Sequence, residues 1–227
     1  MTKETLLEEI IAIEWEMFDT TKNVGSRAPC QDNKSGFIAN RKCQFFAWSE
    51  PVLESYLADL KAAREEDRNL MAEKYARMME SVYTGEYNDL APFLPIISGE
   101  KRMLLSRIMD VQMLWSEEVE EQYPLLSSFG RPRESRKDTA GNTSVETYLW
   151  AELTTYSEAT LAIYYDYIAD LKLRKKNLHE MILQNTARVN GFASASDAED
   201  KLRCILREKM QDNYLEYHGR NHREDYR

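Results

Sequence analysis

The sequence predicts an all-α fold, a single domain built as an irregular bundle of six to eight helices. Apolar residues recur at helical spacing through most of the 227-residue chain, and no run alternates with the period of a strand. Only 8 glycines and 6 prolines interrupt these stretches, which favours long elements with few turns. Because a single core stops growing only beyond about 250–300 residues, we treat residues 1–227 as one helical domain.

Caps and apolar stripes set the expected helix limits. The helices are expected near residues 2–18, 37–48, 51–64, 67–82, 98–123, 144–173 and 196–217. Their expected capping or first-turn residues are Thr2 or Thr5, Pro51, Asp67, Ser98, Ser144, and Ser196 or Asp197. Residues 85–99 are expected to form a connector, 124–143 a mobile basic linker, and 218–227 a frayed tail.

Charge and cysteine usage limit the partners and the compartment. The net charge of −9 repels polyphosphate, so we expect no nucleic-acid partner. No apolar run reaches the roughly 18 residues of a membrane span, and the acidic start of the chain is unlike a signal peptide. The 3 cysteines, Cys30, Cys43 and Cys204, form no closely spaced pair, which favours a reducing, cytoplasmic setting.

The first helix carries a carboxylate on its apolar face. At about 100° per residue, Glu14 falls within the stripe of Leu7, Ile10, Ile11, Met17 and Phe18. A buried carboxylate must be paired, hydrogen-bonded or protonated. Glu14 is therefore a candidate acid or base, an anchor for a substrate cation, or a structural residue paired with Arg41 or a tyrosine hydroxyl.

The connection over residues 19–36 has no helical or strand period. Loops longer than about 12–15 residues in a compact domain are usually functional or disordered. Phe18 and Phe37 stand at its two ends and would attach it to the core, so we expect an ordered loop.

Four residues of this loop are candidate site residues. Arg27 can clamp a carboxylate or phosphate in bidentate fashion, and we expect Asn23 and Gln31 to contact the same ligand. Cys30 is a candidate nucleophile, but a nucleophilic thiol needs a nearby base. The histidines lie far from it in sequence, at His179, His218 and His222. An inert Cys30 is therefore the favoured alternative.

The second helix places Arg41 and Gln44 on the face that also carries Phe37, Phe45 and Trp48. We expect Arg41 to hold Glu14 or the loop backbone, since a buried charge must be paired. Gln44 would support the same site from behind. Glu152, at the edge of an apolar stripe in the 144–173 helix, is a second inward carboxylate.

Several chemistries lack sequence support. No histidine follows a glutamate by three residues, as a di-iron bundle requires, and the pair His218 and His222 lies in the tail. Phosphate loops, nucleophile elbows and dinucleotide fingerprints are all missing from the sequence. We therefore predict no metal and no cofactor, with a metal held by Glu14, Glu152 and a water as the weakest of three readings.

Four segments together resemble a known family. These are EWEMF from Glu14, NVGSRAPCQD from Asn23, RKCQFFAW from Arg41 and NLMAEKYARMME from Asn69. They are similar to a family of bacterial proteins known only as a domain of unknown function, and the similarity is strongest over residues 10–83. The family's loop usually holds two adjacent glycines, whereas this chain has Val24-Gly25-Ser26.

The resemblance implies further site residues. It implies that Asn69, Glu73, Lys74, Tyr75 and Arg77 belong with the site on the first helix. Lys74 and Arg77 lie off the Met71/Tyr75 stripe, so they can line a cleft and bind a ligand. Some relatives are joined to nucleotidyltransferase-like domains, which implies an enzymatic setting without an established activity.

Three functions remain open at this point. The first is binding or conversion of a small anionic or zwitterionic ligand in a cleft formed by Glu14, Arg27, Arg41 and Gln44. The second is a non-catalytic interaction or regulatory module, suggested by the acidic surface and the basic residues 131–137, with a homodimer as one expected assembly. The third is the carboxylate-held metal. A pocket beside Glu14 would favour the first, and a closed core the second.

Overall fold

Helices and the loops between them make up the part of the chain that the computed structural model describes, residues 1–22 and 27–224, with side chains described up to residue 210. The α-helices are α1 (Lys3–Asp19), α2 (Lys34–Phe46), α3 (Glu50–Glu65), α4 (Leu70–Met78), α5 (Thr84–Leu90), α6 (Gly99–Gln122), α7 (Pro124–Ser128), α8 (Val145–Leu153), α9 (Glu158–Leu173), α10 (Leu178–Val189) and α11 (Ala195–Glu224). Short 3-10 turns are η1 (Pro29–Asp32), η2 (Met79–Ser81), η3 (Ala91–Phe93) and η4 (Ser135–Lys137). One isolated bridge joins Thr139 and Asn142. The all-α prediction is confirmed.

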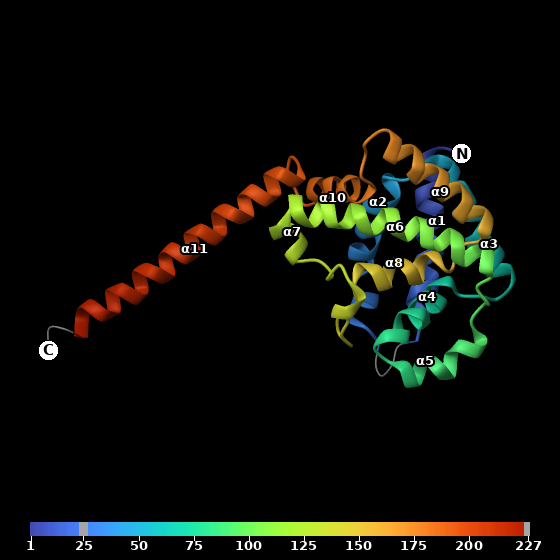
Figure 1. Cartoon of the computed structure of the whole chain (residues 1–227), viewed down its shortest axis with the longest axis horizontal. Helices are drawn as coiled ribbons and strands as arrows, with labels where there is room; N and C mark the ends of the chain where they lie inside the picture. The colour runs from blue at the N-terminus through green and yellow to red at the C-terminus, as the bar shows by residue number, and fades with distance from the viewer. Residues whose placement is uncertain (23–26, 225–227) are drawn as a thin grey trace.

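One hydrophobic core holds most of these helices together, and Figure 1 shows them gathered into one body. Helix α1 packs against α2, α3 and α4, while α6 crosses the body against α8, α9 and α10. The predicted stripe of α1 is buried, namely Leu7, Ile10, Ile11, Met17 and Phe18. Burial of this stripe is what drives α1 into the centre, at about 25 cal/mol per Å² of apolar surface.

The prediction of six to eight helices was too low, because the described chain has eleven. The expected helix over 144–173 is two helices, α8 and α9. Thr154 Oγ1 donates to the carbonyl of Ala151 at 2.7 Å, and Thr155 Oγ1 donates to that of Glu152 at 2.7 Å. Such bonds compete with helix continuation, and Ser157 then caps α9 by accepting from the Thr160 amide.

Other helix limits also differ from the prediction, because capping side chains decided them. Asn33 accepts from the Gly36 amide at 2.9 Å, so α2 begins at Lys34 instead of Phe37. Asp67 has a positive φ of 56° and caps nothing; Asn69 caps α4. Ser194 Oγ accepts from the Asp197 amide, so α11 begins at Ala195.

The two segments expected as connector and linker contain short helices. Residues 85–99 include most of α5 and all of η3, and residues 124–143 include α7 and η4. The second segment is tied to its surroundings: Arg131 Nη1 donates to the Thr143 carbonyl at 2.8 Å, and Arg133 pairs with Glu117 and Glu120 of α6. Its mobility and the fraying of residues 218–227 stay predictions.

Helix α11 leaves the body after its first turns (Figure 1). Ala195 and Ala198 pack there with Tyr123 and Ala187 in a small second core. Glu199 accepts the amides of Leu125 and Leu126 at 3.0 and 2.9 Å, which attaches the base of α11 to α7. In the part of the chain that the structure describes, no helix combines the length and the apolar character needed to cross a membrane.

Candidate functional site

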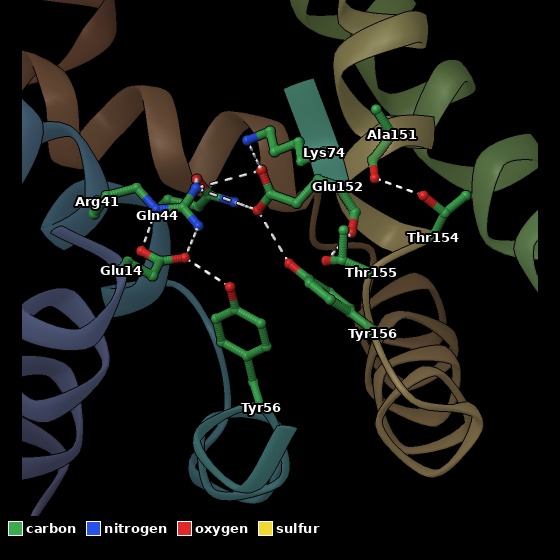
Figure 2. A network of polar contacts seen from close by, with 10 residues as sticks. All are labelled: Glu14, Arg41, Gln44, Tyr56, Lys74, Ala151, Glu152, Thr154, Thr155 and Tyr156. Carbon is green, nitrogen blue, oxygen red and sulfur yellow. Dashed lines mark hydrogen bonds and ion pairs between the residues drawn. The ribbon is translucent and has the colours of Figure 1, made fainter. Parts of the chain in front are cut away.

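Glu14 lies at the centre of the body and is fully buried. Arg41 of α2 reaches it side-on: Nε donates to Glu14 Oε2 at 2.7 Å, and Nη2 donates to Oε1. The Tyr56 hydroxyl of α3 donates to Oε1 at 2.7 Å. Figure 2 shows both partners pointing at the carboxylate from different helices. The expected pairing of Glu14 with Arg41 or a tyrosine is therefore present, with both partners at once.

Glu152 of α8 is the second buried carboxylate, and it shares Arg41 with Glu14 (Figure 2). Arg41 Nη1 donates to Glu152 Oε1 at 3.2 Å, and Lys74 Nζ of α4 donates to Oε2. Gln44 Nε2 and the Tyr156 hydroxyl donate to Oε1 at 3.1 and 3.0 Å. Gln44 also accepts from Arg41 Nη1 at 2.7 Å, so it links the two cation–carboxylate pairs.

We call these residues the buried network: Glu14, Arg41, Gln44, Tyr56, Lys74, Glu152 and Tyr156. Burial by itself would lower the pKa of Arg41, but Glu14 and Glu152 outweigh it and raise that pKa well above its usual value. Burial would likewise raise the pKa of Glu152, yet Arg41 and Lys74 hold it well below its usual range. Two carboxylates and two cations thus form a charge-balanced group away from water.

The tyrosines of the buried network act as permanent donors. Burial, reinforced by the neighbouring carboxylates, raises the pKa values of Tyr56 and Tyr156 well above the ordinary range. Lys74 Nζ additionally lies 3.5 Å from the ring centroid of Tyr148, a cation–π contact. Each charged member of the buried network is therefore matched by protein partners, and Glu14 faces neither of the two surface hollows described below.

Arg27 closes its own loop onto the end of α1. Its Nε donates to Asp32 Oδ1 at 2.8 Å and its Nη1 donates to the Asp19 carbonyl at 2.9 Å, while Nη2 pairs with the Asp19 carboxylate. Gln31 Nε2 donates to the carbonyls of Phe18 and Thr21 at 2.8 and 2.9 Å. Both residues organise the loop in this conformation. Asn23 and Val24–Ser26 lie outside the described residues.

Cys30 is exposed on η1 and is not in a disulfide. The histidine whose side chain is described, His179 of α10, contacts Gln112 of α6 at 2.7 Å. Among the described residues, no group of three His, Cys, Asp or Glu side chains is arranged to hold a metal ion. The catalytic roles predicted for Cys30 and Glu14 stay predictions.

The hollow that carries unpaired charge lies between α4 and α8. It has a volume of about 240 Å³ and is lined by Arg77, Glu80, Ser81, Ser135, Glu146, Thr147 and Trp150. We call it the Arg77 hollow. Arg77 is only 9% exposed, and burial lowers its pKa. Its Nη2 donates to the Pro95 carbonyl at 2.6 Å, whereas its buried Nε has no hydrogen-bond partner in the described part of the protein.

The charged side chains of the Arg77 hollow differ from those of the buried network, because no direct ion pair from the described residues holds them, although Glu73 and Glu80 act on Arg77 through space. Within residues 1–22 and 27–210, neither Arg77 nor Glu80 nor Glu146 takes part in an ion pair. Glu146 Oε2 accepts only the Ser135 amide, at 2.7 Å. A guanidinium and two carboxylates without ionic partners around one concavity are the arrangement expected of a binding site.

A second hollow of about 370 Å³ opens between α1, α2 and α10. Its walls are mainly apolar, with Leu7, Cys43, Phe46 and Val189 among them. It holds no buried polar atom without a partner among the described residues. In the described part of the chain, this hollow therefore has no unpartnered buried polar atom that would select one class of ligand over another.

Sequence reasoning found only one residue of the Arg77 hollow, Arg77 itself, through the resemblance. The same reasoning grouped it with Lys74, which the structure places in the buried network one turn away. Glu146, Thr147 and Trp150 were missed. Their one signal is a shared face of α8, at positions i, i+1 and i+4, and that pattern is common on half-exposed helices.

Comparison with known proteins places the chain in a family. A search of curated proteins and a search of solved structures each find no match. The family profile described as "Protein of unknown function (DUF4125)" matches residues 4–200, which include both the buried network and the Arg77 hollow. This confirms the predicted resemblance to a family of unknown function. The chain belongs to the DUF4125 family.

Proposed function

We propose that this protein binds a small molecule with an acidic group in the Arg77 hollow, and that Glu14 takes no part as an acid or base. The observation that supports the proposal is the buried Arg77 guanidinium, whose Nε has no partner within the described residues and which lines a concavity. A buried donor without an acceptor costs about 1–3 kcal/mol, and more when it is charged. A ligand oxygen would remove that cost.

The chemistry and size of the hollow support a small ligand. Arginine is suited to carboxylates and phosphates because its planar guanidinium donates to two oxygens at once. The volume of about 240 Å³ is below the roughly 300–1,000 Å³ of common ligand pockets. We therefore expect a compact ligand of metabolite size.

The buried network supports the same proposal by fixing the walls of the hollow. Lys74 and Arg77 are one turn apart on α4, and Trp150 and Glu152 lie close together on α8. The Lys74–Glu152 pair thus joins the two helices that carry the hollow. A general base must come within reach of its substrate, and Glu14 is sealed by Arg41 and Tyr56.

Fluorine NMR of protein labelled with 5-fluorotryptophan tests the proposal. The chain has 4 tryptophans, and a Trp150→Phe variant assigns the signal of the hollow. A millimolar mixture of small carboxylic acids and amino acids is expected to move the Trp150 signal and leave those of Trp15, Trp48 and Trp115 in place. Arg77→Met should remove the shift, and Arg207→Met on the projecting part of α11 should keep it.

Two results would contradict this proposal. One is a Trp150 signal that no component of the mixture moves. The other is an unchanged shift in Arg77→Met, which would mean that binding does not use the guanidinium. Arg77→Lys separates charge from geometry, since lysine keeps the charge without the planar pair of donors.

Contact between two copies of the chain through α11 is a second candidate function. It is favoured by the exposed apolar side chains Ile205, Leu206 and Met210 on a helix that leaves the body (Figure 1). In sedimentation velocity, the wild type should form a dimer as concentration rises. Replacing all three residues by serine should weaken it at least about tenfold, whereas Ile96→Ser, also exposed, should not. A wild type that is monomeric at every concentration contradicts this candidate.

We also propose a cytoplasmic location. The support is that Cys30, Cys43 and Cys204 are all free thiols, two of them exposed. Exposed thiols persist in reducing compartments and tend to be oxidised outside them.

A further inference from the structure

We infer that the ligand of the Arg77 hollow is a small zwitterion, an amino acid or a close analogue with a carboxylate and an ammonium group. The inference rests on the proposed function, since it names the class of ligand for that site. It starts from the charges that line the hollow: one guanidinium, Arg77, and two carboxylates, Glu80 and Glu146.

A ligand with a single charge fits this lining poorly. A bare anion would pair with Arg77 but would also meet the field of Glu80 and Glu146, and like charges at short range repel. A bare cation would pair with the glutamates and leave Arg77 Nε without an acceptor. A zwitterion matches both signs, so it is the charge pattern that complements the hollow.

The acceptors available for an ammonium group come from α8 and from η2, the turn that follows α4. Glu146 uses Oε2 for the Ser135 amide, which leaves Oε1 without a hydrogen bond from the described residues. Thr147 Oγ1 and Ser81 Oγ both donate to Asp138 Oδ2, at 2.5 and 2.9 Å. Their hydrogens are therefore committed to Asp138, and their lone pairs can accept. An ammonium group has three donors and no acceptor, which suits such a set.

Trp150 contributes an aromatic wall to the same hollow and is half-buried. An aromatic face packs against aliphatic groups and attracts cations. It thus suits an ammonium group and a short apolar side chain next to it. Thr147 and Trp150 both belong to α8, so one helix would provide a polar and an apolar contact to the same ligand.

Of the two buried donors without partners among the described side chains, only Arg77 Nε belongs to a residue that lines a hollow. The other is Trp48 Nε1. The Trp48 ring is packed between Phe45, Tyr56 and Tyr164, with centroids 4.8 to 5.9 Å away, so there is no room for a ligand beside it. This difference singles out the Arg77 hollow.

A matched set of three probes tests the inference on the full chain. L-Alanine carries both charges, propionate carries only the carboxylate, and ethylamine carries only the ammonium group. Each is titrated while the fluorine signal of Trp150 is followed. We expect L-alanine to bind at least about tenfold more tightly than either singly charged probe, which corresponds to about 1.4 kcal/mol.

A double variant and a matched control identify the side chains that bind the ammonium group. In Glu80→Gln/Glu146→Gln, the binding of L-alanine should weaken and the binding of propionate should strengthen, so that the two affinities converge. Glu208→Gln on the projecting part of α11 is the matched control and should preserve the difference. Both lining glutamates are at least partly exposed, so the double variant is expected to fold.

The outcomes separate this inference from the proposed function. Propionate binding as tightly as L-alanine would overturn the zwitterion and leave the acidic-ligand function standing. Ethylamine binding as tightly as L-alanine would overturn both the inference and the proposed function, because Arg77 would then contribute nothing to binding. A difference that survives in Glu80→Gln/Glu146→Gln would also overturn the inference, since the ammonium group would be recognised elsewhere.

Discussion

Replacing Arg41 by methionine is expected to lower the free energy of unfolding by about 3–5 kcal/mol. Arg41 is the cation that Glu14 and Glu152 share, and all three side chains are at most 5% exposed. Without it, Lys74 balances only one of the two carboxylates of the buried network. An ion that is buried without a partner costs far more than an exposed pair contributes, so this variant should be among the most destabilising single changes in the chain.

Urea unfolding at pH 7 measures this effect, with Arg64→Met as the matched control. Arg64 pairs with Glu16 at 3.7 Å, and both side chains are more than half exposed. Such surface pairs are worth about 0–1 kcal/mol. Similar losses in the two variants would contradict the picture of a sealed, charged network.

Glu152→Gln is expected to cost a comparable amount at neutral pH, about 3–5 kcal/mol, and to flatten the acid side of the stability profile. The amide keeps the shape of the side chain but leaves Lys74 without a counter-charge. In the wild type, the pKa of Glu152 is well below its ordinary 4.5, because Arg41 and Lys74 outweigh the effect of burial.

The sign of the pH effect follows from that shift. The unfolded chain takes up a proton on Glu152 near pH 4.5, whereas the folded protein does so only at much lower pH. The contribution of Glu152 is therefore complete above about pH 5 and is lost as the pH falls below it. The difference in unfolding free energy between wild type and Glu152→Gln should narrow steadily from pH 5 to pH 3. A constant difference would mean that Glu152 is not charged in the folded protein.

The centre of the fold could be predicted because it depends on local periodicity. The helical wheel of the first helix placed Glu14 inward, and the aromatics of the second helix did the same for Arg41. A buried charge needs a partner, so the pair followed. The role of Lys74 could not be predicted in this way, because its partner Glu152 is far along the chain and only tertiary packing brings them together.

Local competition for hydrogen bonds explains the errors in helix limits. Thr154 and Thr155 lie within the long helix expected over 144–173, but their hydroxyls donate to the carbonyls of Ala151 and Glu152, and α8 ends there. Asn33 and Asn69 cap α2 and α4, whereas the prediction had started α2 at Phe37 and capped α4 with Asp67. Periodicity identifies the buried face of a helix better than it identifies the ends.

The loop after α1 shows how a correct residue can receive a different role. Arg27 was predicted to clamp an anion, and two carboxylates of the chain, those of Asp19 and Asp32, occupy it. Both aspartates were visible in the sequence, but their distance from Arg27 depends on the turn η1. To bind a ligand, Arg27 would first have to break its ion pairs with Asp19 and Asp32.

The Arg77 hollow was the least predictable part, since two regions far apart in the sequence build it, α4 with η2 and η4 with α8. Arg77 comes from α4, Ser135 from η4 and Trp150 from α8. No motif links them, and each is ordinary in its own segment. The signal that reveals the site is a missing hydrogen bond on Arg77 Nε, which only coordinates can show.

A crystal structure of the full chain soaked in L-alanine tests the central claim most directly. We predict density for the amino acid in the Arg77 hollow, with its carboxylate on the guanidinium and Glu14 still closed by Arg41 and Tyr56. Density beside Glu14, or a Glu80 side chain that has moved onto Arg77 and fills the hollow, would contradict it.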